Sequence, residues 1–274
     1  MKVFISVDME GITGVATGSH TSSAESDYQR FRKLMTHDVN AAIEGAVEAA
    51  ATGVVVNDSH GPMTNVLIEE LHAEAKLISG NKKHLGMMEG IGNGFGVAFL
   101  VGYHDREGSA DGVLNHTFMG GTVLEIRCNG EPVGEAGVNA GIAGHFGVPM
   151  GLITGDNVVC ADAARRFPGI ETAVVKEAIS RASTCSLTPT KSHALIREHA
   201  KAAVQKAPTL LPYRVLTPVT FEVDFKSTAQ AYACDVFPGL KRIGPRTISF
   251  SAGDYLTAFK MLWGALQLGA AGAR

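Results

Sequence analysis

Short apolar runs alternate with longer amphipathic stretches along the N-terminal half of the chain. Four of these runs have the length and composition of buried strands, namely residues 2–7 (KVFISV), 54–57 (VVVN), 75–79 (AKLIS) and 97–103 (VAFLVGY). Residues 28–50 place apolar side chains near helical spacing, and Gly53 follows as a stop signal. The alternation predicts βαβ units, and therefore an α/β fold with a mostly parallel sheet covered by helices on both faces.

The pattern changes twice further along the chain. Asn129 and Gly130 stand between strand-like residues and predict a hairpin, followed by a Gly- and Ala-rich helix from about Glu135. The βα pattern then resumes with a strand over 150–156 and a helix over 159–167. Beyond these elements we expect a helix over about 190–206, β-rich stretches at 218–225 and 246–252, and a closing helix from Asp254. We place a domain boundary near residue 188, which divides the chain into a catalytic α/β domain (1–188) and a smaller C-terminal α+β subdomain (189–274).

Composition narrows the classes of partner. The chain has 274 residues, of which 45% are hydrophobic and 19% charged, with a net charge of −3. No segment concentrates Lys and Arg, so we expect no nucleic-acid partner and favour small molecules or peptides. No apolar run reaches the roughly 18 residues that span a bilayer, so we expect no membrane partner, and the stretch MKVFISVDME has the character of a strand rather than of a secretory signal. The four cysteines are scattered, which favours reduced thiols in a cytoplasmic protein.

Acidic and imidazole side chains follow three of the predicted strands. The carboxyl ends of parallel strands meet at one edge of a sheet, so we expect these groups to converge although they lie about 50 residues apart. Two like charges side by side, as in VDMEG, are unfavourable unless a proton or a cation neutralises them. The sequence therefore predicts a metal site at this edge. The residues concerned are Asp8 and Glu10 after the first strand, Asp58 and His60 after the second, and His104 and Asp105 after the fourth.

The mixture of ligands favours a first-row divalent ion such as zinc over magnesium or calcium, which prefer all-oxygen shells. Asp8, Glu10, His60 and His104 already exceed the three protein ligands of a catalytic zinc site, and one more acid would allow two metals. Glu125, Glu131 and Glu135 are all candidates for that acid. His116, in GVLNHTFMGG, stands among small and polar residues and is a further candidate for chemistry.

Taken together, the segments SVDMEGITG, VNDSHG, ISGN, GYHD, LNHT and PVGEAGVNA resemble, in order and spacing, the zinc D-aminopeptidases of the DppA type, peptidase family M55. The resemblance covers most of residues 1–190 and is looser beyond. It implies a site with two zinc ions. In that arrangement Asp8 is shared between both ions, Glu10 and His60 complete one shell, and His104 and Glu135 complete the other.

The resemblance also selects Glu135 over Glu125 and Glu131, and it places the family's catalytic histidine on His116. It further implies a ring-shaped homo-oligomer, which is a homodecamer in the family. Asn115 replaces a serine of the founding type, and FMGGTV replaces a bulkier run, so the wall beside His116 is expected to differ.

Our hypothesis is a two-zinc aminopeptidase that cleaves the N-terminal amide bond of small peptides or amino-acid amides, with a preference for D-residues. A hydroxide held between the ions is the expected nucleophile, and His116 could act as nucleophile, acid or base, or oxyanion stabiliser. One alternative is a magnesium-dependent phosphatase of the haloacid-dehalogenase type, because ISVDMEGIT imitates the D-x-D-G-T start of that class. The other is an α/β binding protein without catalytic activity.

Overall fold

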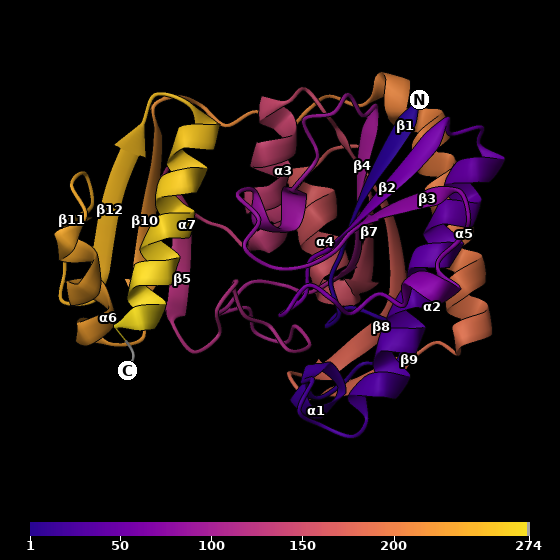
Figure 1. The fold of residues 1–274 in the computed structure, drawn as a ribbon, viewed down its shortest axis with the longest axis horizontal. Coiled ribbons are helices and arrows are strands. Elements are labelled where there is room, and N and C mark those ends of the chain that lie inside the picture. The colour runs from indigo at the N-terminus through magenta and orange to yellow at the C-terminus, as the bar shows by residue number, and fades with distance from the viewer. Residues whose placement is uncertain (273–274) are drawn as a thin grey trace.

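The computed structural model describes residues 1–272 and contains two β-sheets (Figure 1). The larger sheet has seven strands in the order β3-β2-β1-β4-β7-β8-β9. All neighbouring strands in it are parallel except β8 and β9, which form an antiparallel hairpin at one edge. The strands are β1 (Lys2–Val7), β2 (Gly53–Asp58), β3 (Ala75–Ile78), β4 (Val97–Tyr103), β7 (Met150–Asp156), β8 (Glu171–Ser180) and β9 (Ser183–Ser186).

Helices cover both faces of this sheet, as the sequence predicts (Figure 1). On one face, α2 (Tyr28–Glu48) and α5 (Pro189–Lys206) pack against each other and against the sheet, and Val3, Ile5 and Val7 of β1 point into their shared core. On the other face lie α3 (Glu135–His145) and α4 (Asn157–Arg166), in the core that contains Phe4. The α/β fold with a mostly parallel sheet is therefore confirmed.

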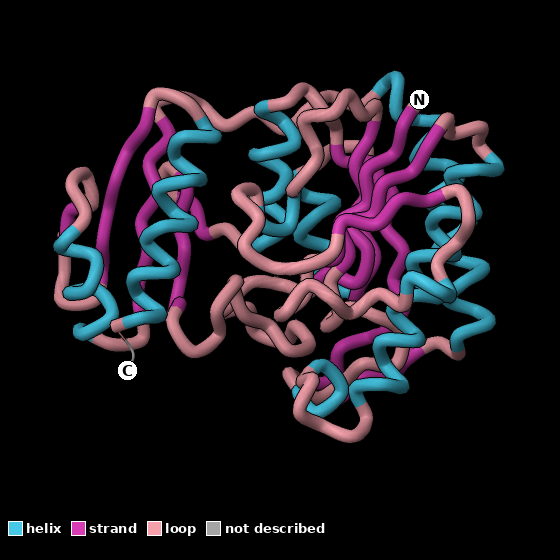
Figure 2. Tube along the Cα trace, in the orientation of Figure 1, coloured by secondary structure: helices cyan, strands magenta, loops and turns pink. Residues whose placement is uncertain are grey.

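The smaller sheet has five strands in the order β11-β12-β10-β5-β6, and α7 (Tyr255–Ala271) lies along one of its faces (Figure 2). Its strands are antiparallel, and Asn129 and Gly130 form the predicted hairpin turn with positive φ angles of 50° and 85°. The strands are β5 (Val123–Cys128), β6 (Glu131–Pro132), β10 (Val219–Phe225), β11 (Lys241–Arg242) and β12 (Thr247–Ala252). Short helices complete the fold, namely α1 (Gly18–Thr21), α6 (Thr228–Ala233), and the 3-10 turns η1 (Ile68–Glu70), η2 (Gly86–Met88), η3 (Ala207–Thr209) and η4 (Cys234–Val236).

The two sheets do not divide the chain at residue 188, where we expected a domain boundary. Strands β5 and β6 precede that position and belong to the smaller sheet, whereas α5 follows it and packs on the larger one. One hydrophobic core also extends from α3 into the smaller sheet. A hydrogen bond from the Tyr255 hydroxyl of α7 to the Val138 carbonyl of α3, at 2.9 Å, joins the same two parts. The chain enters the smaller sheet twice, first with β5 and β6 and again with β10 to β12, which a change of sequence texture could not reveal.

Two further elements differ from the sequence prediction. We predicted no strands over residues 171–186, where β8 and β9 form the edge of the large sheet. Their alternation of buried and exposed positions is weak, so the period-2 signal of a half-buried strand is faint. Within residues 1–272, no helix combines the length and apolar character needed to cross a bilayer.

Candidate metal centre

Strand β1 has β2 on one side and β4 on the other, with all three strands parallel. Their carboxyl ends therefore bring the predicted strand-end groups to one place. The chain after β1 packs directly on the end of β4, with the Gly11 amide donating to the Gly102 carbonyl at 2.8 Å. A Cβ atom on Gly11 would lie 2.0 Å from the Tyr103 carbonyl oxygen, and one on Gly102 would lie 2.3 Å from that of Asp8. The glycines of DMEG and GYHD are thus required for the close approach of two loops that carry acids and histidines.

Asp8, Glu10 and His60 form a first cluster. His60 Nδ1 lies 3.2 Å from Asp8 Oδ1 and 2.9 Å from Glu10 Oε2. All three side chains are largely buried, with 13% of the His60 side chain exposed and less than that of the two acids. One ligand atom from each of the three residues lies within 4.8 Å of the others, which is close enough for all three to bind one metal ion.

His104, Glu135 and His116 form a second cluster. Glu135, the first residue of α3, places Oε1 3.4 Å from His104 Nε2 and 3.8 Å from His116 Nε2. Asp8 connects the two clusters, because its Oδ2 lies 3.4 Å from His104 Nε2 while its Oδ1 faces His60. The structure therefore brings together the six residues that the family resemblance assigns to the site, and Asp8 lies between the two groups.

The three imidazole rings are oriented in the same way. His60 Nε2 donates to the Thr21 carbonyl at 3.0 Å, His104 Nδ1 to the Asp105 carbonyl at 2.8 Å, and His116 Nδ1 to the Leu114 carbonyl at 2.9 Å. A carbonyl oxygen can only accept a hydrogen bond, so one nitrogen of each ring carries a hydrogen atom and donates it to the main chain. The other ring nitrogen faces the carboxylates. This is the usual arrangement of metal-ligating histidines.

The ring nitrogens that face the carboxylates require a proton or a metal ion beside them. Within the described residues, buried His104 Nε2 has no hydrogen-bond partner, although carboxylate oxygens of Asp8 and Glu135 lie near it. A lone pair facing a carboxylate is repulsive unless a proton or a metal ion lies between them. The donor set of imidazole nitrogens and carboxylate oxygens suits zinc. The residues present therefore fit a metal centre.

In the absence of a metal ion, protons bind to the ring nitrogens that face the carboxylates. Burial lowers the pKa of His60 and of His104, but the neighbouring carboxylates outweigh burial and raise both pKa values well above the usual range. Burial raises the pKa of Asp8 and of Glu135, but here the imidazoles outweigh it and both pKa values fall. Both directions express the same attraction between carboxylate and cation, which a divalent ion would satisfy more strongly.

The other acids named from the sequence lie outside the two clusters. Asp58 accepts hydrogen bonds from the Asn65 and Val66 amides and so shapes the loop after β2. Asp105 accepts from the Arg106 amide at 2.8 Å and belongs to neither cluster. Two rejected candidates for the fifth ligand lie elsewhere as well: Glu125 is paired with Arg127 on the small sheet, and Glu131 is exposed at the end of β6.

The sequence reasoning missed a buried lysine beneath the first cluster. Lys176 of β8 is 1% exposed, and its Nζ donates to the main-chain carbonyls of Glu10, Ile12 (3.1 Å) and Val15 (2.7 Å). Burial lowers the pKa of Lys176 to about 7. A lone Lys in the apolar run TAVVKEAIS was the available signal, but it requires that residues 171–180 be recognised as a buried strand. Lys176 fixes the loop that carries Glu10.

A second hydrogen-bond network supports the site from behind. The Tyr103 hydroxyl lies 2.6 Å from Ser6 Oγ and 2.9 Å from Asn139 Nδ2, and all three side chains are buried. Asn139 stands one helical turn after Glu135 on α3, so the network connects β1, β4 and α3. The network fixes the relative positions of these three elements, which carry Asp8, His104 and Glu135.

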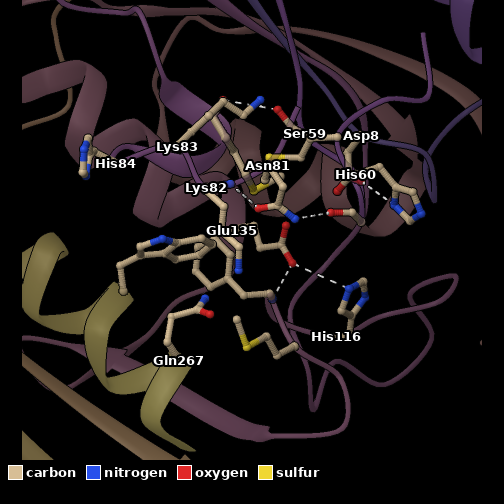
Figure 3. Close-up of a pocket in the computed structure, with 16 residues that line it drawn as sticks. Asp8, Ser59, His60, Asn81, Lys82, Lys83, His84, His116, Glu135 and Gln267 are labelled. Carbon is tan, nitrogen blue, oxygen red and sulfur yellow. Dashed lines mark hydrogen bonds and ion pairs between the residues drawn. The ribbon is translucent and has the colours of Figure 1, made fainter. Parts of the chain in front are cut away.

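The two clusters open into a cavity of about 570 Å³ (Figure 3). Asp8, His60, Glu135 and His116 form part of its wall. The remaining wall comes from the segments after β2 and β3, the loop after His116, and α7, with Ser59, Gly61, Met63, Asn81, Lys82, Lys83, His84, Met87, Phe118, Met119, Trp263 and Gln267. The volume is typical of a pocket for a small molecule.

Comparison with known proteins agrees with this geometry. The model of the family Peptidase_M55, described as D-aminopeptidase, matches residues 1–264. The chain belongs to the M55 D-aminopeptidase family. A D-aminopeptidase of Bacillus subtilis (strain 168) is 36% identical over 263 residues, which cover 96% of this chain and 95% of the relative.

A solved structure of the same family has nearly the same fold. It is described as the Zn-dependent D-aminopeptidase DppA from Bacillus subtilis, a self-compartmentalizing protease. The TM-score is 0.95 at 35% identity, with 98% of each chain covered. Membership of M55 does not favour the phosphatase or the binding-protein alternative, and neither of them accounts for histidines that follow β2 and β4.

Proposed function

We propose that this chain is a zinc-dependent aminopeptidase that cleaves the N-terminal amide bond of small peptides or amino-acid amides, with a preference for D-residues. The observation that carries the proposal is the position of Asp8. Its two carboxylate oxygens face histidines of different clusters, His60 and His104, and so suit a shared ligand of two ions. Glu10 and His60 would complete one shell, and His104 and Glu135 the other.

Zinc ions bound there would supply a Lewis acid that polarises an amide carbonyl and lowers the pKa of water. The protein would supply orientation and a proton-transferring group. His116 suits the second role, because 20% of its side chain is exposed to the cavity, against 1% for His104. Its Nδ1–H is held by the Leu114 carbonyl, so Nε2 is the atom that would hold or release a proton near the scissile bond.

The geometry also allows His116 as a third ligand of the second cluster, since its Nε2 lies within metal-site distance of the His104 and Glu135 ligand atoms. We propose the catalytic role, because a ligand that faces the cavity would reduce the space for substrate at that end. An ion held by the first cluster would offer a binding position for the free amino terminus of the substrate. Such binding would favour removal of N-terminal residues over internal cleavage.

We further propose that copies of this chain assemble into a ring-shaped homo-oligomer, a decamer as expected from the family, that encloses the active sites. The related DppA is described as self-compartmentalizing. Large apolar side chains that a monomer would leave in water support this proposal, namely Leu211 (87% exposed), Leu216 (82%), Val236 (76%) and Tyr232 (67%). A cytoplasmic location belongs to the same proposal, in agreement with four free cysteines.

The test is a substrate screen on the purified protein. The protein is stripped with a chelator and reloaded with zinc. It is then assayed against matched D- and L-aminoacyl dipeptides and amides, with a phosphate ester as the contrasting substrate. We expect hydrolysis of the D-series, two zinc ions per chain by elemental analysis, and a solution mass several times the chain mass of 28.8 kDa. Phosphatase activity without amide hydrolysis would refute the proposed function.

A further inference from the structure

Basic side chains line the cavity in addition to the groups of the metal centre. Bound zinc would offset the negative charge of the metal-centre carboxylates. The basic side chains come from the segment after β3 and are Lys82, Lys83 and His84. In the close-up His84 lies on the side away from His60 and His116, and Lys82 lies between (Figure 3). A substrate that places its scissile bond at the metal centre and a negative charge near these basic groups matches this arrangement.

Lys82 is the lysine that remains available. Lys83 Nζ donates to Asn57 Oδ1 at 2.7 Å and to the Asp58 carbonyl at 2.6 Å, so it is engaged in holding the end of β2. Within residues 1–272, the Lys82 ammonium group has neither a hydrogen-bond acceptor nor an acidic partner, although its side chain lines the cavity. An unpaired cation at the rim of a substrate pocket can bind an anion at little cost in lost protein contacts.

The backbone holds Lys82 in a fixed place. Asn81 Oδ1 accepts from the Lys82 amide at 2.7 Å, and Asn81 Nδ2 donates to the Gly61 carbonyl at 3.2 Å. Lys82 has a φ of +66°, an unfavourable conformation for a residue with a side chain. The segment is thus tied to the loop that follows His60, so Lys82 keeps a constant position relative to the metal centre.

We propose that Lys82 binds the C-terminal carboxylate of the substrate, and that the enzyme therefore prefers short peptides with a free carboxylate to amidated peptides and amino-acid amides. This inference rests on the proposed function and specifies its substrate class. A short peptide is a zwitterion. Its N-terminal amine would lie at the metal centre while its carboxylate reaches Lys82, so both ends are recognised at once.

The experiment compares two substrates that differ only in the charge at the C-terminus, a D,D-dipeptide and the same dipeptide as its C-terminal amide. Zinc-loaded wild type is expected to cleave the free acid with the higher kcat/KM. Lys82→Met should lower kcat/KM for the free acid by about tenfold to a hundredfold, the usual effect of losing a charge-assisted hydrogen bond, and leave the amide nearly unchanged. Lys82→Arg should retain the preference. The matched control is Lys76→Met, an exposed lysine of β3 outside the cavity, which should alter neither rate.

The outcomes separate this inference from the proposed function. Equal cleavage of the two dipeptides by wild type, or an equal loss on both in Lys82→Met, would overturn the role of Lys82 and leave the aminopeptidase intact. Cleavage of neither dipeptide by the zinc-loaded wild type would overturn both. A selective loss on the free acid that Lys82→Arg restores would support carboxylate recognition, since a merely structural residue would affect both substrates.

Discussion

The imidazole rings of His104 and His116 are stacked, with centroids 4.1 Å apart and planes inclined by 11°. Both rings direct Nε2 toward the same oxygen of Glu135, yet only His116 lines the cavity. The pair thus combines a buried histidine suited to hold a metal with an accessible one suited to act on substrate.

Substitution of His116 separates these two roles. His116→Ala should retain two zinc ions per chain and lose turnover by about 10²- to 10⁴-fold, the usual contribution of a general acid or base. Elemental analysis and kcat measured on the same sample check this. Loss of one zinc ion from His116→Ala would identify His116 as a ligand instead. His145→Ala provides a control, because His145 is exposed and lies outside the cavity.

Replacement of Asp8 should affect both metal ions. Asp8→Ala removes the one carboxylate that faces both His60 and His104, so zinc affinity should fall by more than about a hundredfold and activity should be lost with it. Glu10→Ala should weaken the first site and spare the second. Metal titration followed by calorimetry distinguishes the two variants. An Asp8→Ala protein that still holds two equivalents of zinc would show that Asp8 is not shared.

The stability of the zinc-free protein should depend on pH in a defined direction. The pKa values of His60 and His104 are raised by their acidic neighbours, so their stabilisation is complete below pH 6.5 and lost as pH rises through the raised values. The pKa values of Asp8 and Glu135 are lowered, so their stabilisation is present above about pH 4 and lost in acid. The zinc-free protein should therefore be most stable between about pH 4.5 and 6.5.

Bound zinc should prevent the loss of stability that the zinc-free protein shows as pH rises above about 6.5. The ion would occupy the positions of the protons that His60 and His104 lose. Thermal unfolding with a chelator and with zinc, from pH 4 to 9, measures the effect, and each kcal/mol corresponds to about 2–4 °C in Tm. The difference in Tm between the two conditions should grow as pH rises above 6.5. Parallel curves over the whole range would contradict the assignment of these histidines as metal ligands.

Lys176→Met should weaken both the fold and the first metal site. The substitution leaves three buried carbonyls, those of Glu10, Ile12 and Val15, without their donor, so the free energy of unfolding should fall by about 1–3 kcal/mol. Zinc affinity should fall more at the Glu10 site than at the His104 site, which distinguishes positioning from general destabilisation. Chemical denaturation and metal titration check the two effects, with the exposed Lys191→Met as the matched control. Equal losses at both sites would argue against a positioning role.

The sequence by itself determined the strands β1, β2 and β4 and the groups that follow them. A buried parallel strand is a short apolar run, and the acids and histidines stand directly after these runs, so their convergence followed from one rule about strand ends. The segment motifs further identified Glu135 and His116, which no strand-end rule reaches.

Tertiary structure decided what no local pattern shows. Composition leaves Glu125, Glu131 and Glu135 equivalent, and the packing of α3 against the end of β4 explains why Glu135, which the motifs favour, lies beside His104. The return of the chain to the smaller sheet, the carbonyl contacts of Lys176 and the position of Lys82 in the cavity wall all depend on long-range contacts. Hydrophobic periodicity reports which face of an element is buried, but it carries no information about which distant element covers that face.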